Sequence, residues 1–282
     1  MKACKKTRQT AMTVMSLLTR TLVISGALLT TALLPAATLA TEDFSYANGS
    51  LYNLSGGTGF ASAWSGTSTD WKVVDGSASI SSAGTSGSSR KLSTSLTATT
   101  TPTFYFSFTL SVDAYGAGTG YFNDYLAFVN ASDSAVFSVG GSKPASFDYR
   151  LQTELKGVTG AQRLISNNIA NPEGSTFSIV GKFTFNDGTG NSVLSVWVNP
   201  TGTEDATAAA LVYSWAVTET EITHIKLVRW AGGTANATES FDNIRIGSDW
   251  SSVTGPIPEP STYAVIFGAF VMTTVVLRKC RR

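Results

Sequence analysis

The sequence predicts an all-β fold: a single jelly-roll sandwich of about ten short strands. Three observations predict it. Apolar and polar residues alternate along several stretches, and segments rich in Gly, Asn, Ser and Thr separate these stretches. No stretch of the central region has the period of an amphipathic helix.

The strongest strand pattern covers residues 104–112. Five apolar residues occupy every second position, with Tyr, Ser or Thr between them. Side chains at alternate positions of a strand lie on opposite faces, so this stretch predicts a strand with one buried aromatic face. The buried positions would be Phe104, Phe106, Phe108, Leu110 and Val112.

The turn NDGTGN (186–191) separates two further strand-like segments, TFSIVGKFTF (176–185) and VLSVWVN (193–199), and predicts a β-hairpin. The Ser- and Gly-rich segment Ser79–Ser89 predicts a long loop. Other strands are predicted at WKVV (71–74), DYLAFV (124–129), AVFSV (135–139), FDYRLQTEL (147–155), LVYSWAV (211–217), ITHIKLVRW (222–230) and SFDNIRI (240–246).

The amino terminus has the organisation of a secretory signal peptide. Five basic residues and no acid occur in residues 1–20, an apolar run follows from Leu22 to Leu34, and small residues end at Ala40. We expect cleavage near Ala40. The predicted domains are a signal peptide (1–40), a β-sandwich (41–250), a linker (251–257) and a carboxy-terminal segment (258–282).

The charge of the central region argues against nucleic-acid binding. Residues 41–257 hold 11 of the 20 Lys and Arg and 18 of the 19 Asp and Glu, a net charge of −7. Nucleic-acid binding requires a basic face. The two cysteines, Cys4 and Cys280, lie outside this region, so no disulfide framework is available to it and its core must stabilise it.

The carboxy terminus combines a proline-rich turn, an apolar run and a basic cluster. Residues 263–277 carry no charge, and with Ser261 and Thr262 the uncharged run is about 17 residues, close to the lower limit for a membrane-spanning helix. The cations that follow would stay in the cytoplasm, which leaves the β-domain outside. These cations are Arg278, Lys279, Arg281 and Arg282.

This ending resembles the PEP-CTERM sorting signal of Gram-negative bacteria. The resemblance rests on the order of its parts, the motif Pro258-Glu259-Pro260-Ser261 before the apolar span and the basic end. It implies recognition by an exosortase, a membrane protease that cuts near the motif. It also implies transient anchoring in the inner membrane, transfer to the cell surface or matrix, and an association with exopolysaccharide or biofilm.

The central region is similar to concanavalin A-like (LamG-type) jelly rolls. The similar stretches are FSYANGSLYNLSGGTGFASAWSG (44–66), VLSVWVNP (193–200) and FDNIRIGSDWSSV (241–253). These are packing and edge patterns, so the resemblance implies a fold rather than a function.

Catalytic residues are poorly supplied. His224 is the only histidine and is predicted on the polar face of a strand, and no nucleophile-elbow motif occurs. A glycoside hydrolase, which needs two carboxyl groups facing one cleft, is the enzymatic alternative. Glu219 and Glu221 have a suitable spacing, but they lie in a predicted turn. We therefore expect a protein that is not an enzyme.

Binding of a glycan needs only aromatic rings and a few polar groups. Trp197 shares its predicted strand face with polar residues, and Tyr115 and Tyr121 lie on a predicted loop between strands. These three residues are the candidate glycan-binding residues. The alternative for each is a packing role, with Trp197 covered by another sheet or a loop.

Calcium is the candidate metal. Glu42 and Asp43 near the start of the domain and Asp242 near its end could share a structural calcium ion through their oxygens. Together these features predict an exported bacterial surface or matrix protein with a binding or structural role. The alternative is a secreted polysaccharide-active enzyme.

Overall fold

The computed structural model describes residues 37–66, 71–80, 84–115, 120–144, 148–157, 162–186, 190–217, 219–232 and 237–255. The chain separates into two units, Met1–Ala37 and Thr38–Arg282, and every element below belongs to the second. The expected signal peptide lies almost entirely outside the described residues. The expected sorting signal, from Pro258 to Arg282, lies wholly outside them.

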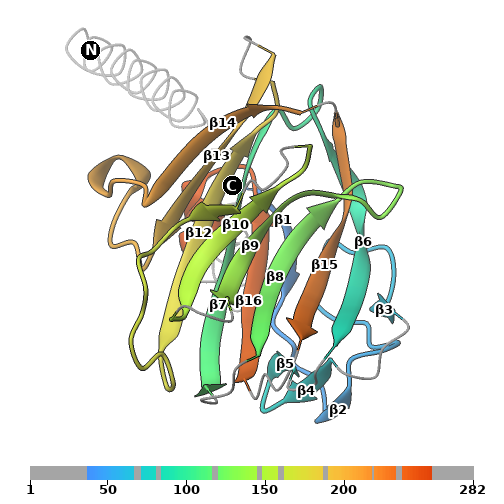
Figure 1. The fold of residues 1–282 in the computed structure, drawn as a ribbon. Helices are drawn as coiled ribbons and strands as arrows, with labels where there is room; N and C mark the ends of the chain where they lie inside the picture. The colour runs from blue at the N-terminus through green and yellow to red at the C-terminus, as the bar shows by residue number, and fades with distance from the viewer. Residues whose placement is uncertain are drawn as a thin grey trace, which may run out of the picture. The chain divides into compact units, whose positions relative to one another are not determined.

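The described strands form a β-sandwich of two antiparallel sheets, which confirms the all-β prediction (Figure 1). The nine-stranded sheet has the order β14-β13-β12-β7-β16-β5-β4-β2, with β1 also paired to β16. Its strands are β1 (Thr38–Glu42), β2 (Gly49–Ser50), β4 (Lys72–Val74), β5 (Ser77–Ile80), β7 (Thr103–Tyr115), β12 (Thr176–Thr184), β13 (Asn191–Val198), β14 (Leu211–Ala216) and β16 (Ala237–Gly247).

The seven-stranded sheet has the order β11-β10-β9-β8-β15-β6-β3. Neighbouring strands in this order are antiparallel and hydrogen-bonded. Its strands are β3 (Ser65–Gly66), β6 (Thr85–Thr97), β8 (Tyr121–Val129), β9 (Ala135–Lys143), β10 (Arg150–Leu155), β11 (Gln162–Leu164) and β15 (Glu221–Gly232).

Phenylalanine rings from both sheets meet in the core. Phe106 on β7 lies 4.7 Å from Phe128 on β8, between ring centroids, and Phe128 lies 4.7 Å from Phe137 on β9. Phe137 in turn lies 4.8 Å from Phe183 on β12, which returns the contact to the nine-stranded sheet. The predicted inner face of residues 104–112 is therefore confirmed, because all five of its apolar side chains are buried.

Gly181 allows this packing. It pairs with Phe106 across β12 and β7, and a β-carbon at Gly181 would overlap the Phe106 ring. A larger residue would therefore displace the ring from the core.

A short helix closes the domain against the outer face of the nine-stranded sheet. In α2 (Trp250–Thr254), Asp249 caps the amino end: its carboxylate accepts a hydrogen bond from Ser252 N at 2.9 Å. Trp250 and Val253 are buried against the sheet. Helix α2 therefore occupies most of the stretch predicted to be a linker, and the folded unit extends to its end.

Two loop predictions are wrong. Ser79–Ser89 is mostly strand: Ser79 and Ile80 are the last two residues of β5, and β6 begins at Thr85. Tyr115 is the last residue of β7 and Tyr121 the first of β8, so neither lies on the predicted loop. In both cases the pairing of long neighbouring strands outweighs the low strand propensity of Ser and Gly.

The start of the domain also differs in detail from the sequence boundaries. Strand β1 begins at Thr38 and pairs with β16, so residues on both sides of the expected cleavage point lie in one strand. Within the described residues, neither η1 (Glu204–Ala206) nor α2 is long and apolar enough to cross a bilayer. The expected membrane-spanning segment lies outside that part of the chain.

Truncating Phe106 tests the aromatic core. We expect Phe106→Ala to lower the free energy of unfolding by about 3–5 kcal/mol, because it removes ring contacts to two strands of the opposite sheet and leaves a cavity. Urea denaturation measures the change. Thr109→Ala, on the outer face of the same strand, is the matched control and should change stability by less than about 0.5 kcal/mol. Equal losses in both variants would contradict the face assignment.

Candidate functional site

The outer face of the seven-stranded sheet carries two exposed aromatic rings. Trp230 on β15 is 52% exposed and Tyr121 on β8 is 45% exposed. Tyr121 pairs with Gly232, two residues beyond Trp230, so the two side chains are diagonal neighbours about 7–8 Å apart. The Tyr121 ring lies over Gly232, where a β-carbon would overlap it.

Polar side chains surround these rings. Asn123 pairs with Trp230 across the strands, and its Oδ1 accepts a hydrogen bond of 2.6 Å from Ser142 Oγ. We call the surface formed by Tyr121, Asn123, Ser142 and Trp230 the aromatic face. The exposure of Trp230 follows from the alternation of side chains along a strand: its neighbours Arg229 and Ala231 point inward and are buried, so Trp230 points outward.

A groove of about 430 Å³ lies next to the aromatic face. It reaches Thr85, which pairs with Trp230, and Val228, two residues before Trp230. Small residues open its floor: Gly87 lies under the aliphatic part of Lys226. Lys226 Nζ pairs with the Asp133 carboxylate at the groove's edge. The lining of the groove therefore combines small and apolar residues with the polar side chains of Thr, Ser, Asp and Lys.

The face continues as a polar row toward β10. Gln152 donates a hydrogen bond to the Tyr125 hydroxyl, and Arg150 Nε donates to Gln152 Oε1 at 3.2 Å. Glu154 lies on the same side, and burial raises the pKa of its carboxyl group. Gln152 and Tyr125 are buried, so they cannot touch a ligand. Arg150 is half-buried and lies in the same cross-strand row as Asn123 and Trp230, so its guanidinium can orient a hydroxyl-rich ligand that rests on the two rings.

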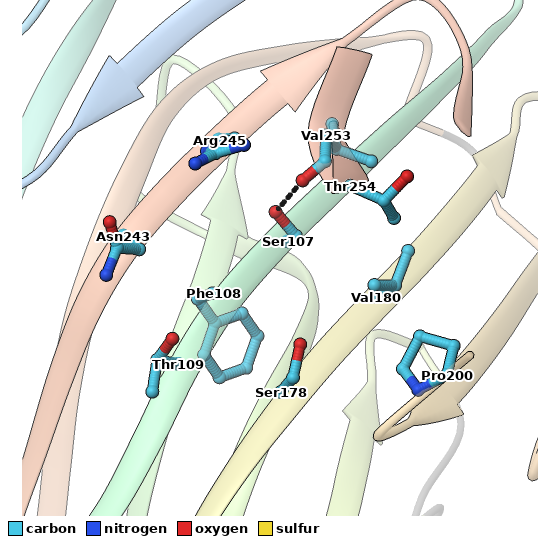
Figure 2. A pocket seen from close by; sticks show the side chains of 10 residues that line it. All are labelled: Ser107, Phe108, Thr109, Ser178, Val180, Pro200, Asn243, Arg245, Val253 and Thr254. Carbon is cyan, nitrogen blue, oxygen red and sulfur yellow. Dashed lines mark hydrogen bonds between the residues drawn. The ribbon is translucent and has the colours of Figure 1, made fainter. Parts of the chain in front are cut away.

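A second groove lies on the outer face of the nine-stranded sheet, beside α2 (Figure 2). Its volume is about 340 Å³, and Ser107, Thr109, Ser178, Asn243 and Arg245 give it a polar lining. Here helix α2 and the residue that follows it are held to the sheet: Ser107 Oγ donates to Val253 O at 2.8 Å, and Arg245 donates to Gly255 O. This groove has no exposed aromatic ring among its lining residues.

Trp197 lies under helix α2 rather than at a binding surface. It is 5% exposed, and its ring centroid is 5.0 Å from that of Trp250 at an interplanar angle of 78°. Its indole Nε1 donates to Thr207 O at 2.8 Å. The packing alternative for Trp197 therefore describes the structure, with α2 as the cover. The side chain of Tyr115 lies outside the description, and Tyr121 is exposed on the aromatic face.

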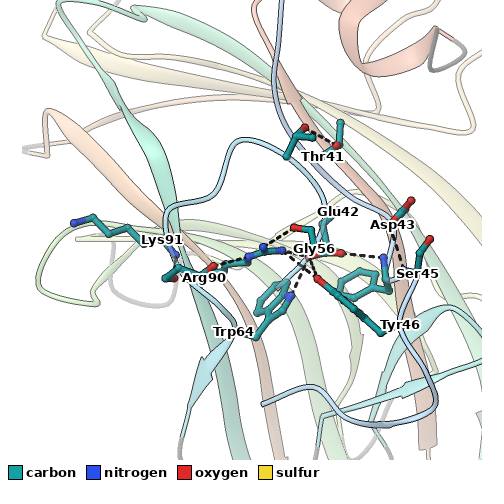
Figure 3. A network of polar contacts seen from close by, with 12 residues as sticks. Thr41, Glu42, Asp43, Ser45, Tyr46, Gly56, Trp64, Arg90 and Lys91 are labelled. Atoms are coloured by element: carbon teal, nitrogen blue, oxygen red, sulfur yellow. Dashed lines mark hydrogen bonds and ion pairs between the residues drawn. The ribbon is translucent and has the colours of Figure 1, made fainter. Parts of the chain in front are cut away.

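Glu42 belongs to a buried polar network rather than to an open metal site (Figure 3). Its carboxylate pairs with Arg90 and accepts hydrogen bonds from Trp64 Nε1 at 3.0 Å, the Tyr46 hydroxyl at 2.9 Å and Phe44 N at 3.0 Å. Burial, followed by the contact with Glu42, raises the pKa of Tyr46 to about 12.

The structure brings the other predicted calcium ligands together but does not complete a site. Strand β1 pairs with β16, so the two ends of the domain are neighbours. Burial raises the pKa of Asp242, and the negative charges of Asp43 and Glu42 add to the increase. Asp242 accepts hydrogen bonds from Asn243, and Asp43 accepts one from Ser45 N at 3.2 Å. Among the described residues, no three His, Cys, Asp or Glu side chains are grouped to hold a metal ion.

The predicted acidic pair and the histidine have ordinary structural positions. Glu219 pairs with Lys156, and Glu221 is exposed at the start of β15. His224 lies on the outer face of β15, as predicted, and its Nδ1 lies 2.7 Å from Thr223 Oγ1. The sorting residues Pro258, Glu259, Pro260 and Ser261 and the basic cluster lie beyond the described chain.

Trp230 and Asn123 were not predicted as site residues. For Trp230, the sequence did hold a signal: the alternation of ITHIKLVRW places it on the same strand face as His224 and Lys226. That alternation defines two faces but does not say which of them another layer covers.

No family model matches the chain, and no curated protein matches it. Among solved structures, the globular domain of T. cruzi calreticulin is similar with a TM-score of 0.47 and 12% identity, covering 86% of this chain and 100% of that domain. Lectin II from Ulex europaeus has a TM-score of 0.39 at 12% identity, over 65% of this chain and 91% of the lectin. A Trypanosoma rangeli sialidase has a TM-score of 0.43 at 13% identity, over 74% of this chain but 30% of the sialidase.

The Glu42–Arg90 pair offers a test of the buried network. We expect Arg90→Met to lower the free energy of unfolding by about 3–5 kcal/mol, because it leaves the buried Glu42 carboxylate without its cation. Asp133→Asn, which breaks the exposed pair with Lys226, is the control and should cost less than about 1 kcal/mol. Chemical denaturation compares the two. A loss at Arg90 no larger than that at Asp133 would show that the network is not stabilising.

Proposed function

We propose that this chain is an exported bacterial surface or matrix protein that binds polysaccharide through the aromatic face. The observation that carries the proposal is the pair of exposed rings, Trp230 and Tyr121, beside polar side chains and an open groove. Exposed tryptophan and tyrosine rings bury a large apolar area when a ligand stacks on them, and polar groups beside them fix its orientation.

The composition of the face favours a sugar polymer over an apolar partner. The half-buried side chains of Asn123 and Arg150 supply hydrogen-bonding groups within the same sheet surface as the rings, and the buried Ser142 hydroxyl donates to Asn123. An interface for an apolar protein surface would instead have a core depleted in such groups. The groove is open on the sheet surface, so an internal segment of a long polysaccharide could lie along it.

The expected targeting segments support the export part of the proposal. A signal peptide would carry the β-sandwich across the inner membrane, and the carboxy-terminal segment would hold it there until exosortase-type processing near Pro258–Ser261. The resemblance to PEP-CTERM proteins implies a mature protein at the cell surface or in an exopolysaccharide matrix.

A binding role accounts for the described carboxyl groups better than hydrolysis does. A glycosidase needs two carboxyl groups facing one cleft. On the aromatic-face side, Glu154 lies beside the amides of Gln152 and Gln162, and the Asp133 carboxylate is paired with Lys226. The close pair Asp124 and Glu239 is fully buried. We therefore propose a non-enzymatic protein; release of reducing sugar from a bound polysaccharide would contradict this.

Affinity electrophoresis tests the aromatic face. Gels containing laminarin, xylan or alginate should retard the purified domain (residues 38–255), and Trp230→Ala should weaken retardation about 30-fold, corresponding to about 2 kcal/mol for a central stacking tryptophan. Tyr52→Ala removes a ring of similar exposure outside the aromatic face and should leave retardation unchanged. Equal behaviour of the two variants would contradict the assignment of the face.

The sorting signal has a separate test. In cells with active processing, mature protein should end near Pro258–Ser261, whereas Glu259→Ala should accumulate as a longer, membrane-held form. The substitution leaves the apolar span unchanged, so insertion should survive while recognition fails. Mass spectrometry of the carboxy-terminal peptide measures this, with Glu221→Ala as the control. Secreted wild-type protein that retains Arg278–Arg282 would contradict the processing.

A further inference from the structure

Three ionisable side chains meet inside the sandwich, directly beneath the aromatic face. Asp124 on β8, Arg229 on β15 and Glu239 on β16 are all completely buried, and they come from both sheets. Asp124 Oδ2 lies 3.1 Å from Arg229 Nη2, which also donates to Ala237 O at 3.0 Å. The Phe122 ring lies 5.5 Å from the guanidinium carbon.

The charges of this cluster do not balance if both acids are ionised. One guanidinium faces two carboxyl groups in a space from which water is excluded, and a buried carboxylate without a partner is very costly. Burial, with the charge of Asp124 adding to it, raises the pKa of Glu239 well above its ordinary value. Burial also raises the pKa of Asp124 to about 6, although Arg229 opposes this shift.

The neighbouring titratable groups do not supply a second cation to the pair. The Tyr149 hydroxyl and the Glu239 carboxyl both lie against Gly141, and burial raises the pKa of Tyr149 well above its usual range. Lys143 points inward from β9, but its Nζ donates to Gly120 O at 3.3 Å. Tyr125 and Glu154 lie on the other side of the seven-stranded sheet, and neither carries positive charge.

The same strands carry the aromatic face on their other side. Arg229 pairs with Asp124 across β15 and β8, and the next pair along is Trp230 with Asn123. Since successive side chains of a strand point to opposite faces, the buried ion pair sets the register of the exposed pair.

We propose that Asp124 and Glu239 share one proton over Arg229 at neutral pH, and that this proton-dependent contact positions Trp230 and Asn123 on the aromatic face. The consequence for ligand binding rests on the proposed function; the sharing of the proton does not. Asp124, Arg229 and Glu239 are positioning residues in this scheme, because they are buried and cannot touch a ligand.

The sign of the pH dependence follows from the raised pKa values. The folded chain keeps a proton that the unfolded chain releases above the ordinary pKa of Glu. The stabilisation is therefore complete at acid pH and is lost as the pH rises toward the pKa of Glu239 in the folded state. Within this window each pH unit should lower the folding equilibrium constant of the wild type about tenfold through this one group.

Urea denaturation at pH 6, 7 and 8 tests the shared proton. Glu239→Gln keeps the shape of a protonated glutamate but cannot release the proton, so its folding constant should gain about tenfold per pH unit relative to the wild type. Glu221→Gln, an exposed acid on β15, is the matched control and should run parallel to the wild type. Parallel profiles for all three proteins would overturn the proposal.

A second measurement does not depend on the variant folding. Infrared spectroscopy of the wild-type domain at pH 7 should show the carbonyl band of a protonated carboxyl group, and its absence would overturn the proposal. With laminarin, xylan or alginate in the gel, wild-type retardation should weaken between pH 6 and 8 more than that of Glu239→Gln. Unequal unfolding profiles with no retardation on any polysaccharide would overturn the proposed function alone.

Discussion

Contact between phenylalanine rings of the two sheets is the interaction on which the rest of this structure depends. The central region has no cysteine, so no disulfide bond connects its two sheets and the packing of side chains must hold them together. Phe106, Phe128, Phe137 and Phe183 form a continuous run of ring contacts from one sheet to the other and back. Each ring buries a large apolar area, and tilted or offset contacts of this kind add to the gain from burial.

Two polar clusters interrupt this apolar interior, and each connects distant parts of the chain. The Glu42–Arg90 pair ties the first strand of one sheet to a long strand of the other. Trp64 and Tyr46 donate to the same carboxylate oxygen as Arg90, and Phe44 N donates to the other. Asp124, Arg229 and Glu239 likewise connect the two sheets at another point. Buried charges are costly unless their partners are in place, so such clusters favour one register of the strands over its alternatives.

The two outer faces of the sandwich differ because helix α2 covers part of one of them. Helix α2 packs Trp250 and Val253 onto the nine-stranded sheet, where Trp197 becomes part of a small second core. The seven-stranded sheet has Trp230 and Tyr121 exposed beside a groove. Rings of the same kind therefore have different surroundings: Trp197 packs under helix α2, and Trp230 remains exposed.

The sequence by itself determined the all-β class, the inner face of β7 and the hairpin of β12 and β13, because a period of two residues is a local property of the chain. It also determined which kinds of chemistry were poorly supplied. Only the tertiary structure decided that Trp197 is covered and Trp230 exposed, since alternation defines two faces of a strand without saying which is buried. It likewise decided that Glu42 faces Arg90, 48 positions away, and that Ser79–Ser89 contributes to two strands. These outcomes depend on contacts between segments far apart in the chain, and local propensity carries no information about such contacts.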